Sequence, residues 1–445
     1  NPGRASVAWY TPLRRSRMPP MLRGVDAFAR LSNVAWSALR SVEVIPVLAR
    51  VLDGEPAERE IDRFLRARRS YGANERAAAV EAIFGVGLWR RRLAWHAGSA
   101  EPRMLLFALL RDLAGMEEAV AGALCDLGPP WPPRRPEPER LADRWSLPDA
   151  LEAILLRELG SEAEAFAEAI SVPGPICLRA NALRTCRASV ARRLREEGVE
   201  TVETQSAPHG LLVTTARPNL LALASFREGL FEVQDEGSQL VAALCAARAG
   251  EVVLDACAGA GGKTLALAAD LRNEGRLVAC DPDRDRLRRL GERARRAGAL
   301  VEIADRPPPD LRADVVLVDA PCSGLGILRR GPDARFRIGD LEERALPATG
   351  EGRRPEHTIA HLPRLQREIL DGVLPLTRPG GRIVYATCTI RSEENEEVAL
   401  AFERDHPGLV REPQGAFFHT FPHRDGTDAF FAARWMVSRG SHAAR

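Results

Sequence analysis

The spacing of apolar residues divides the chain into a helical first part and an alternating second part. Between residues 21 and 127, apolar residues recur every three or four positions in stretches centred on Phe28, Val47 and Ile83. This spacing predicts amphipathic helices, because it places the apolar side chains on one helix face. Residues 139–170 return to the same spacing. We therefore expect helices on both sides of the segment that separates these stretches.

That separating segment is rich in proline. Six of the residues between 129 and 138 are prolines. Proline lacks the amide hydrogen that a helix or a central strand requires, and its φ angle is locked. We therefore predict a stiff linker over residues 129–138.

From Pro173 on, short apolar runs replace the helical spacing. A predicted helix over residues 188–198 lies among three runs that predict strands: Cys177–Arg179, Leu211–Val213 and Leu230–Val233. We expect a small α/β unit that ends near residue 230.

The rest of the chain alternates regularly between apolar strands and amphipathic helices. We predict strands over 251–256, 276–280, 314–318, 382–386 and 430–437, and helices over 238–248, 264–271, 283–297, 362–376 and 393–405. This alternation indicates an α/β fold with a doubly wound, mostly parallel sheet. Ligands of such sheets bind at the carboxyl ends of the strands.

Length and composition narrow the class of protein. A chain of 445 residues with 45% hydrophobic and 28% charged residues is expected to form two or three globular domains. No apolar stretch approaches the roughly 20 residues that span a bilayer, and no signal core is evident, so we expect no membrane association and no export. The eight cysteines form no C-x-x-C pair, which argues against a metal site and suits a reducing cytoplasm.

The charge is distributed unevenly. Residues 1–100 hold 17 arginines and 9 acidic residues, although the whole chain carries only +2. A basic first domain suggests a polyanion partner such as RNA or DNA. Composition alone leaves open that these arginines are solvated surface charges.

A glycine-rich loop follows the predicted strand at 251–256. It consists of Cys257, Ala258, Gly259, Ala260, Gly261, Gly262 and Lys263, and Lys263 is the only lysine of the chain. A strand, a glycine-rich turn and a helix together hold nucleotide-like ligands in α/β domains. The P-loop template fails here, because it requires a glycine at the position of Cys257.

Acidic and thiol side chains follow the other predicted strands. Asp281 is placed to accept hydrogen bonds from the ribose hydroxyls of a nucleoside, and Asp305 to accept one from an adenine amino group. Asp319 and Cys322 follow the strand at 314–318, and Cys388 follows the strand at 382–386. We predict that these strand ends surround one crevice, and that Cys322 and Cys388 are functional thiols.

Nine segments of the second part form a recognisable series. They are Arg179–Arg184, Gly229–Leu240, Cys257–Lys263, Asp319–Gly324, Leu365–Gln366, Pro379–Gly381, Tyr385–Ile390, Glu394–Glu396 and Asp425–Phe431. In this order they resemble the motifs of the RsmB/Nop/Sun family of S-adenosylmethionine-dependent RNA cytosine-C5 methyltransferases. The resemblance covers roughly residues 175–437.

The resemblance implies a role for each site residue. Cys388 is the expected nucleophile, which adds to C6 of the cytosine and so activates C5. Cys322 is expected to help release the methylated product, and Asp319 to pair with ring nitrogen N3. Lys263 is expected to approach the base or the cofactor carboxylate, and to lower the pKa of a nearby thiol. The cofactor implied is S-adenosyl-L-methionine, held by residues 257–263 with Asp281, Asp305 and Asp319.

The helical first domain resembles the NusB-like RNA-binding domain through Tyr71–Arg76 and Ile83–Arg92. In this family that domain points to 16S ribosomal RNA as the substrate. The expected organisation is a disordered leader (1–20), a NusB-like domain (21–128), the linker (129–138), a helical connector with a small α/β domain (139–230), a seven-stranded methyltransferase domain (231–438) and a tail (439–445). We expect a cytoplasmic monomer.

The sequence departs from the family pattern in three places. Ala260 stands where the family has a proline, Ala429 stands where it prefers a glycine, and residues 338–356 look like an insertion. Without the proline, the φ angle at this position is not fixed, so the turn of the loop is less restrained. Two alternative functions stay open: methylation of transfer RNA by the same chemistry, and a non-catalytic RNA-binding or assembly factor of NusB type.

Overall fold

The computed structural model describes residues 27–28, 30–216, 218–331, 334–337, 359–412 and 416–439. The chain forms two compact units. One contains the described residues up to Pro173 and those within Leu328–Glu343; the other contains Gly174–Ile327 and the described residues from 359 on. The predicted leader (1–20), the insertion (338–356) and the tail beyond residue 439 lie outside the described residues.

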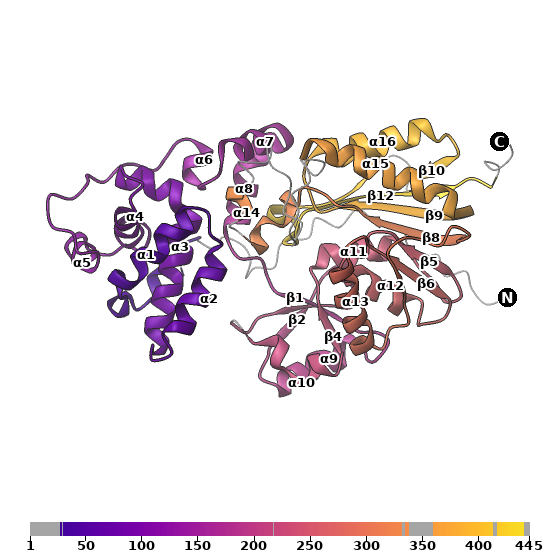
Figure 1. Cartoon of the computed structure of the whole chain (residues 1–445), viewed down its shortest axis with the longest axis horizontal. Coiled ribbons are helices and arrows are strands. Elements are labelled where there is room, and N and C mark those ends of the chain that lie inside the picture. Colours follow the sequence, from indigo (N-terminus) through magenta and orange to yellow (C-terminus); the bar gives the residue numbers. More distant parts are fainter. Residues whose placement is uncertain are drawn as a thin grey trace. The chain divides into compact units, whose positions relative to one another are not determined.

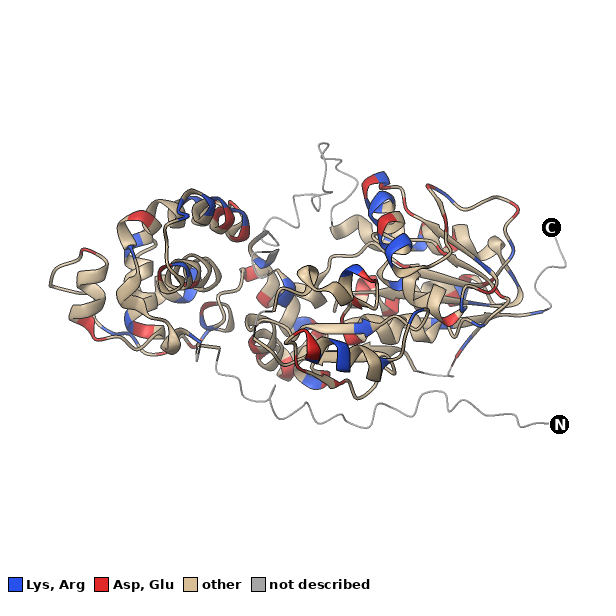
Figure 2. Cartoon of the chain, turned by 90° about the horizontal axis from the view of Figure 1, so that it is seen from below, with Lys and Arg blue, Asp and Glu red and all other residues tan. Residues whose placement is uncertain are grey.

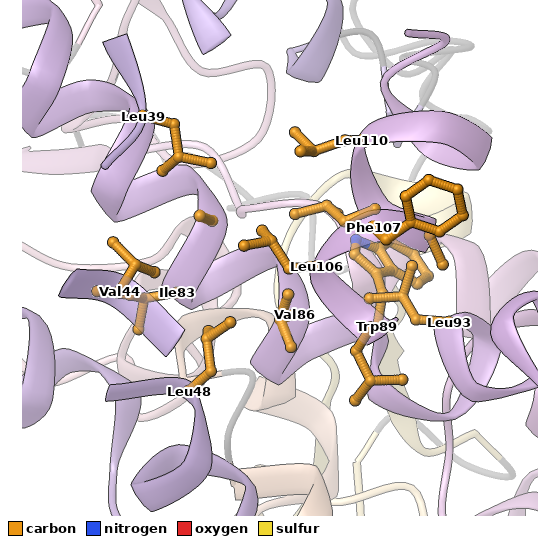
Figure 3. Packing of buried hydrophobic residues seen from close by; sticks show 14 of the residues in the cluster. Leu39, Val44, Leu48, Ile83, Val86, Trp89, Leu93, Leu106, Phe107 and Leu110 are labelled. Carbon is orange, nitrogen blue, oxygen red and sulfur yellow. The ribbon is translucent and has the colours of Figure 1, made fainter. Parts of the chain in front are cut away.

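The first unit is helical, as its apolar spacing predicts. Its helices are α1 (Ser41–Leu52), α2 (Ala57–Ala67), α3 (Ala73–Ala97), α4 (Pro102–Ala108), α5 (Glu118–Leu124), α6 (Leu141–Arg144), α7 (Asp149–Leu159), α8 (Ala163–Ser171) and α14 (Ala334–Arg337) (Figure 1). Val44, Val47, Leu48 and Val51 form the buried stripe of α1, because positions three and four apart share one helix face. Figure 3 shows two of these residues packed among side chains of α3 and α4.

Two segments join this unit in ways that the sequence did not predict. The proline-rich segment packs on the helices, because Arg111 donates to the carbonyl of Pro132 at 2.6 Å and Trp95 to that of Pro136 at 2.9 Å. Helix α14 comes from far along the chain, and its buried Arg335 donates to the carbonyl of Ile170 at 2.7 Å. Acidic and basic positions are interspersed over the helices (Figure 2).

The second unit begins with a small antiparallel sheet of four strands in the order β2-β3-β1-β4. The strands are β1 (Cys177–Ala180), β2 (Thr201–Glu203), β3 (Gly210–Val213) and β4 (Phe231–Val233), and the helices α9 (Arg187–Glu196) and α10 (Ala224–Arg227) accompany them. Three of these strands were predicted. The missed strand, β2, is only three residues long and is largely exposed, so it lacks an apolar pattern.

The large sheet of the second unit has eight strands. Seven follow the order β10-β12-β9-β8-β5-β6-β7, and β11 pairs with β12. The strands are β5 (Val252–Asp255), β6 (Arg276–Cys280), β7 (Glu302–Ala304), β8 (Ala313–Asp319), β9 (Thr377–Thr387), β10 (Leu409–Arg411), β11 (Phe418–Thr420) and β12 (Phe430–Val437). All pairings of β5 to β9 are parallel, and β12 runs antiparallel to its neighbours. The predicted doubly wound, mostly parallel fold is confirmed, with one strand more than the seven expected.

Helices cover both faces of this sheet. They are α11 (Glu236–Leu244), α12 (Gly262–Asp270), α13 (Arg284–Ala297), α15 (Leu362–Val373) and α16 (Glu396–Asp405), close to the predicted helices (Figure 1). Val316 and Val318 of β8 pack with α15 and α16, whereas Val315 and Leu317 pack with α11 and α12. Because both faces are buried, the central strands are continuous apolar runs. Among the described residues, no helix is long and apolar enough to cross a membrane.

Candidate active site

The glycine-rich loop joins the end of β5 to the start of α12. Gly259 and Gly261 have φ angles of +53° and +89°, in the left-handed region that favours glycine. A Cβ atom at Gly261 would lie 2.8 Å from Cγ of Leu290, so the space for a side chain is also missing. The amide of Ala258 donates to the carbonyl of Cys280 at 2.8 Å, which fixes the loop to the end of β6.

The carboxylate of Asp281 lies under this loop. It accepts hydrogen bonds from the amides of Gly259 and Asp283, both at 2.9 Å, and its side chain is buried. These contacts place Asp281 at the loop, at the end of β6. Asp305 follows the short strand β7 and is exposed at the same edge of the sheet.

A hydrogen bond supports the loop where Ala260 departs from the family pattern. Arg293 of α13 donates to the carbonyl of Ala260 at 2.7 Å and forms an ion pair with Glu232 of β4 at 2.9 Å. Because the ion pair with Glu232 fixes the guanidinium group, its hydrogen bond to Ala260 can restrain the turn that a proline would otherwise preset. Arg293 could not be identified from the sequence, because its partners are 33 and 61 positions away.

Cys322 and Cys388 lie side by side at the ends of two paired strands. Strands β8 and β9 are parallel neighbours, with Asp319 opposite Ala386, so the turns that follow them are adjacent. The two Sγ atoms are 3.3 Å apart, and the amide of Cys388 donates to Sγ of Cys322 at 3.3 Å. The amide of Gly326 donates to the carbonyl of Cys388 at 2.9 Å and ties the two turns together.

The environment of Cys322 favours its protonated form. The hydrogen bond with Cys388 and burial raise the pKa of the Cys322 thiol well above its usual value. A thiol that keeps its proton suits a role in proton transfer better than the role of attacking nucleophile.

Lys263 and Asp319 form an ion pair next to the two thiols. Nζ of Lys263 lies 2.7 Å from Oδ2 of Asp319 and 5.0 Å from the ring centre of Phe430. Burial acts to lower the pKa of Lys263, but the charge and hydrogen bond of Asp319 outweigh it, so the pKa is raised. Lys263 is therefore a fixed cation whose first partner is Asp319. The expected approach of Lys263 to the base or the cofactor carboxylate, and its expected lowering of the pKa of a nearby thiol, stay predictions.

A buried carboxylate, that of Glu394, is hydrogen-bonded to the turn that contains Cys322. Oε2 of Glu394 accepts hydrogen bonds from the amide of Ser323 at 2.9 Å and from Nε2 of Gln366 at 3.1 Å. Gln366 also donates to the carbonyl of Pro321 at 2.9 Å. In the sequence, Glu394 and Gln366 are recognisable only as members of motifs. Their roles depend on contacts with a distant turn, which spacing along the chain does not reveal.

The remaining cysteines lie outside this pair. Cys257 is in the loop, where burial raises the pKa of its thiol well above the usual value. Burial also raises the pKa of Cys125 and of Cys280 to about 12. Among the described residues, no group of three or more His, Cys, Asp or Glu side chains is arranged to hold a metal ion.

Comparisons with known proteins give matches over most of the second unit and over the last helices of the first. A family model described as "16S rRNA methyltransferase RsmB/F" matches residues 242–436, and a model of the RsmF/B-like ferredoxin-like domain matches residues 147–219. The probable ribosomal RNA small subunit methyltransferase B of Synechocystis sp. is 32% identical over 66% of this chain and 67% of its own length. The curated relatives are matched over 59 to 67% of their own length.

Solved structures also resemble the chain. The methyltransferase homolog protein from Pyrococcus horikoshii is 25% identical, with a TM-score of 0.55 over 67% of this chain and 97% of its own. NSun6 from Pyrococcus horikoshii with SFG is 22% identical, with a TM-score of 0.54 over 65% of this chain and 98% of its own, and this likeness concerns the fold.

Proposed function

The chain belongs to the RsmB/F family of 16S rRNA methyltransferases, and from this we propose that it transfers a methyl group from S-adenosyl-L-methionine to C5 of a cytosine in RNA. The observation that carries the proposal is the pair of sulfur atoms, 3.3 Å apart, beside the ion pair of Lys263 and Asp319. Cytosine C5 is a poor nucleophile, so a thiol that adds to C6 is the group that this reaction requires.

The glycine-rich loop fits S-adenosylmethionine, which supplies an electrophilic methyl group on a sulfonium. Cβ atoms built at Gly259 and Gly262 meet no atom within 4 Å, so this face of the loop is open. The loop amides near the start of α12 can receive the carboxylate of the methionine part, as helix N-termini receive anions. Asp281, and at the rim Asp305, would hold the nucleoside part.

In the proposed reaction, the thiolate of Cys388 forms a bond to C6 of an extruded cytosine. The electrons of the C5–C6 double bond move toward N3. N3 takes up a proton from solvent and donates it in a hydrogen bond to the Asp319 carboxylate. With S-adenosylmethionine bound, C5 would act as an enamine carbon and take the methyl group, while the C–S bond of the sulfonium would break and S-adenosylhomocysteine would leave. The positive charge of Lys263 stabilises the negative charge of the Asp319 carboxylate during these steps, because the two groups are already in contact.

The adduct is resolved when solvent takes the C5 proton, Cys388 leaves C6 as a thiolate and N3 gives its proton back to solvent. We assign assistance in this step to Cys322, whose sulfur lies beside that of Cys388. The cytosine must leave its stack to reach the crevice, which is easiest in a loop or single strand of RNA.

We propose 16S ribosomal RNA as the substrate, the first helical domain as a NusB-like RNA-binding domain, and a monomer in the cytoplasm as the working form. A transfer assay with methyl-labelled S-adenosylmethionine tests this assignment on separate 16S ribosomal and transfer RNA. Label in 5-methylcytidine of 16S RNA supports it. Label confined to transfer RNA would favour the alternative substrate. Binding without label would identify a non-catalytic assembly factor.

Replacing Gly261 with alanine is expected to weaken S-adenosylmethionine binding roughly tenfold or more. The new Cβ combines a left-handed backbone with a 2.8 Å contact to Leu290, and such strain costs about 1–3 kcal/mol. Isothermal titration calorimetry measures the effect. Gly250→Ala is the matched control, because its φ is +87° and a Cβ there meets no atom within 4 Å. Equal affinity in both variants would contradict this role of the loop.

A further inference from the structure

A pocket rich in arginine lies in the second unit, apart from the two thiols. It has a volume of about 710 Å³ and is lined by Leu183, Arg184, Arg227, Glu228, Leu230, Arg295 and Arg296. The residues come from the loop after β1, the end of α10 with the turn before β4, and the end of α13. Four guanidinium groups therefore converge from three segments of the chain.

The backbone beneath the pocket is tightly packed. Nδ2 of Asn181 donates to the carbonyls of Gly229 and Ala297, both at 2.8 Å, and so joins the turn before β4 to the end of α13. A Cβ atom at Gly229 would lie 2.1 Å from the carbonyl oxygen of Arg296, so the two segments touch. These contacts fix the backbone segments that carry the arginines of the pocket.

Three of the four arginines are held by contacts that leave most of their N–H groups available. Arg184 donates from Nε to the carbonyl of Ala297 at 3.1 Å, and Arg227 donates from Nη2 to the carbonyl of Ala222 at 2.6 Å. Arg296 lies over the ring of Phe226 at 3.8 Å and pairs with Glu232. Because a guanidinium has five N–H donors, each keeps several for a ligand.

The charge of the pocket is strongly positive. Arg295 is exposed and has no ion-pair partner among the residues that the structure describes, and neither Arg184 nor Arg227 has one there. The only acidic lining residue, Glu228, pairs with Arg193 at 3.2 Å, outside the pocket lining. Converging guanidinium groups with free donors match the oxygens of phosphate groups.

We infer that this pocket binds a backbone phosphate of the RNA substrate, several nucleotides away from the methylated cytosine. Helix α13 starts beside Asp281 at the catalytic edge and ends at the pocket, and its 14 residues span about 21 Å. This length corresponds to several nucleotides of a strand, so one RNA can reach both places. This inference rests on the proposed RNA substrate and adds a second point of attachment to it.

The test compares two double variants of the full chain. Arg227→Gln with Arg295→Gln removes two exposed cations of the pocket. Arg272→Gln with Arg289→Gln is the control, because both side chains are exposed, lie outside the pocket lining and change the net charge equally. Binding of a fluorescein-labelled RNA stem-loop, measured by anisotropy across a salt series without S-adenosylmethionine, gives Kd and its salt dependence.

The pocket variant is expected to bind RNA roughly tenfold more weakly, with a slope of log Kd against log salt lowered by about one to two, as lost phosphate contacts require. The control is expected to match the parent, and both variants to keep its S-adenosylmethionine affinity. Equal Kd and slope in the two double variants would overturn the inference. A parent protein that binds RNA with this pattern but transfers no methyl group would contradict the proposed function and leave the pocket in place.

Discussion

Replacing Cys388 with alanine is expected to abolish methyl transfer, with kcat lowered roughly 10³-fold or more. Without the thiol, no bond to C6 forms, and C5 stays too electron-poor to attack the methyl group. The measurement is single-turnover transfer of labelled methyl to RNA, with S-adenosylmethionine binding as the check on folding. Cys186→Ala is the matched control, because Cys186 is an exposed thiol on the small α/β domain. We expect it to retain the parent rate.

This variant also separates two possible uses of the thiol pair. DNA cytosine methyltransferases attack through the cysteine of a Pro-Cys motif, which here is Cys322 next to Pro321. In our assignment Cys322 keeps its proton, since the hydrogen bond with Cys388 and burial raise its pKa. An active Cys388→Ala protein would reverse the roles of the two cysteines.

Replacing Cys322 with alanine is expected to trap the enzyme on its RNA. The thiol of Cys388 still adds to C6 and the methyl group is still transferred, but release from the product is slowed. The protein should therefore migrate as a covalent RNA complex on a denaturing gel, and the fraction trapped should depend on added S-adenosylmethionine.

The double variant with both cysteines replaced by alanine supplies the control for this prediction. It should form no complex that survives denaturation, because the attacking sulfur is absent. A Cys322→Ala protein that turns over at the parent rate without an adduct would remove Cys322 from the reaction. An adduct in the double variant would show that another residue attacks.

Much of the fold could be predicted because its long elements repeat a simple pattern. The central strands β5, β6, β8 and β9 are apolar on both faces, so they read as continuous apolar runs. No bounds were predicted for the strands β7, β10 and β11, because each has three residues, and those of β7 and β10 are at least partly exposed. The proline-rich segment was predicted as a linker, but its packing on the helices depends on Arg111 and Trp95, which are distant in sequence.

The candidate site, like the fold, was predicted where it follows from strand ends and not where it depends on contacts between distant residues. Parallel strands end at one edge of a sheet, so strand ends alone predicted that Asp281, Asp319, Cys322 and Cys388 would surround one crevice. The partner of Lys263 could not be predicted, because Asp319 is 56 positions away in the sequence and other acidic residues also follow the strands of this sheet. The support from Glu394 and Arg293 also required the structure, since each residue binds a turn that lies in a different segment of the chain.

Bisulfite sequencing of ribosomal and transfer RNA tests the central claim most directly. Cells that lack this protein are compared with the same cells carrying either the parent gene or the Cys388→Ala variant. We predict that one cytosine of 16S ribosomal RNA is protected from conversion only when the parent protein is present. A protection pattern that does not change between these cells, or one that the Cys388→Ala variant restores, would contradict cytosine-C5 methylation through this thiol.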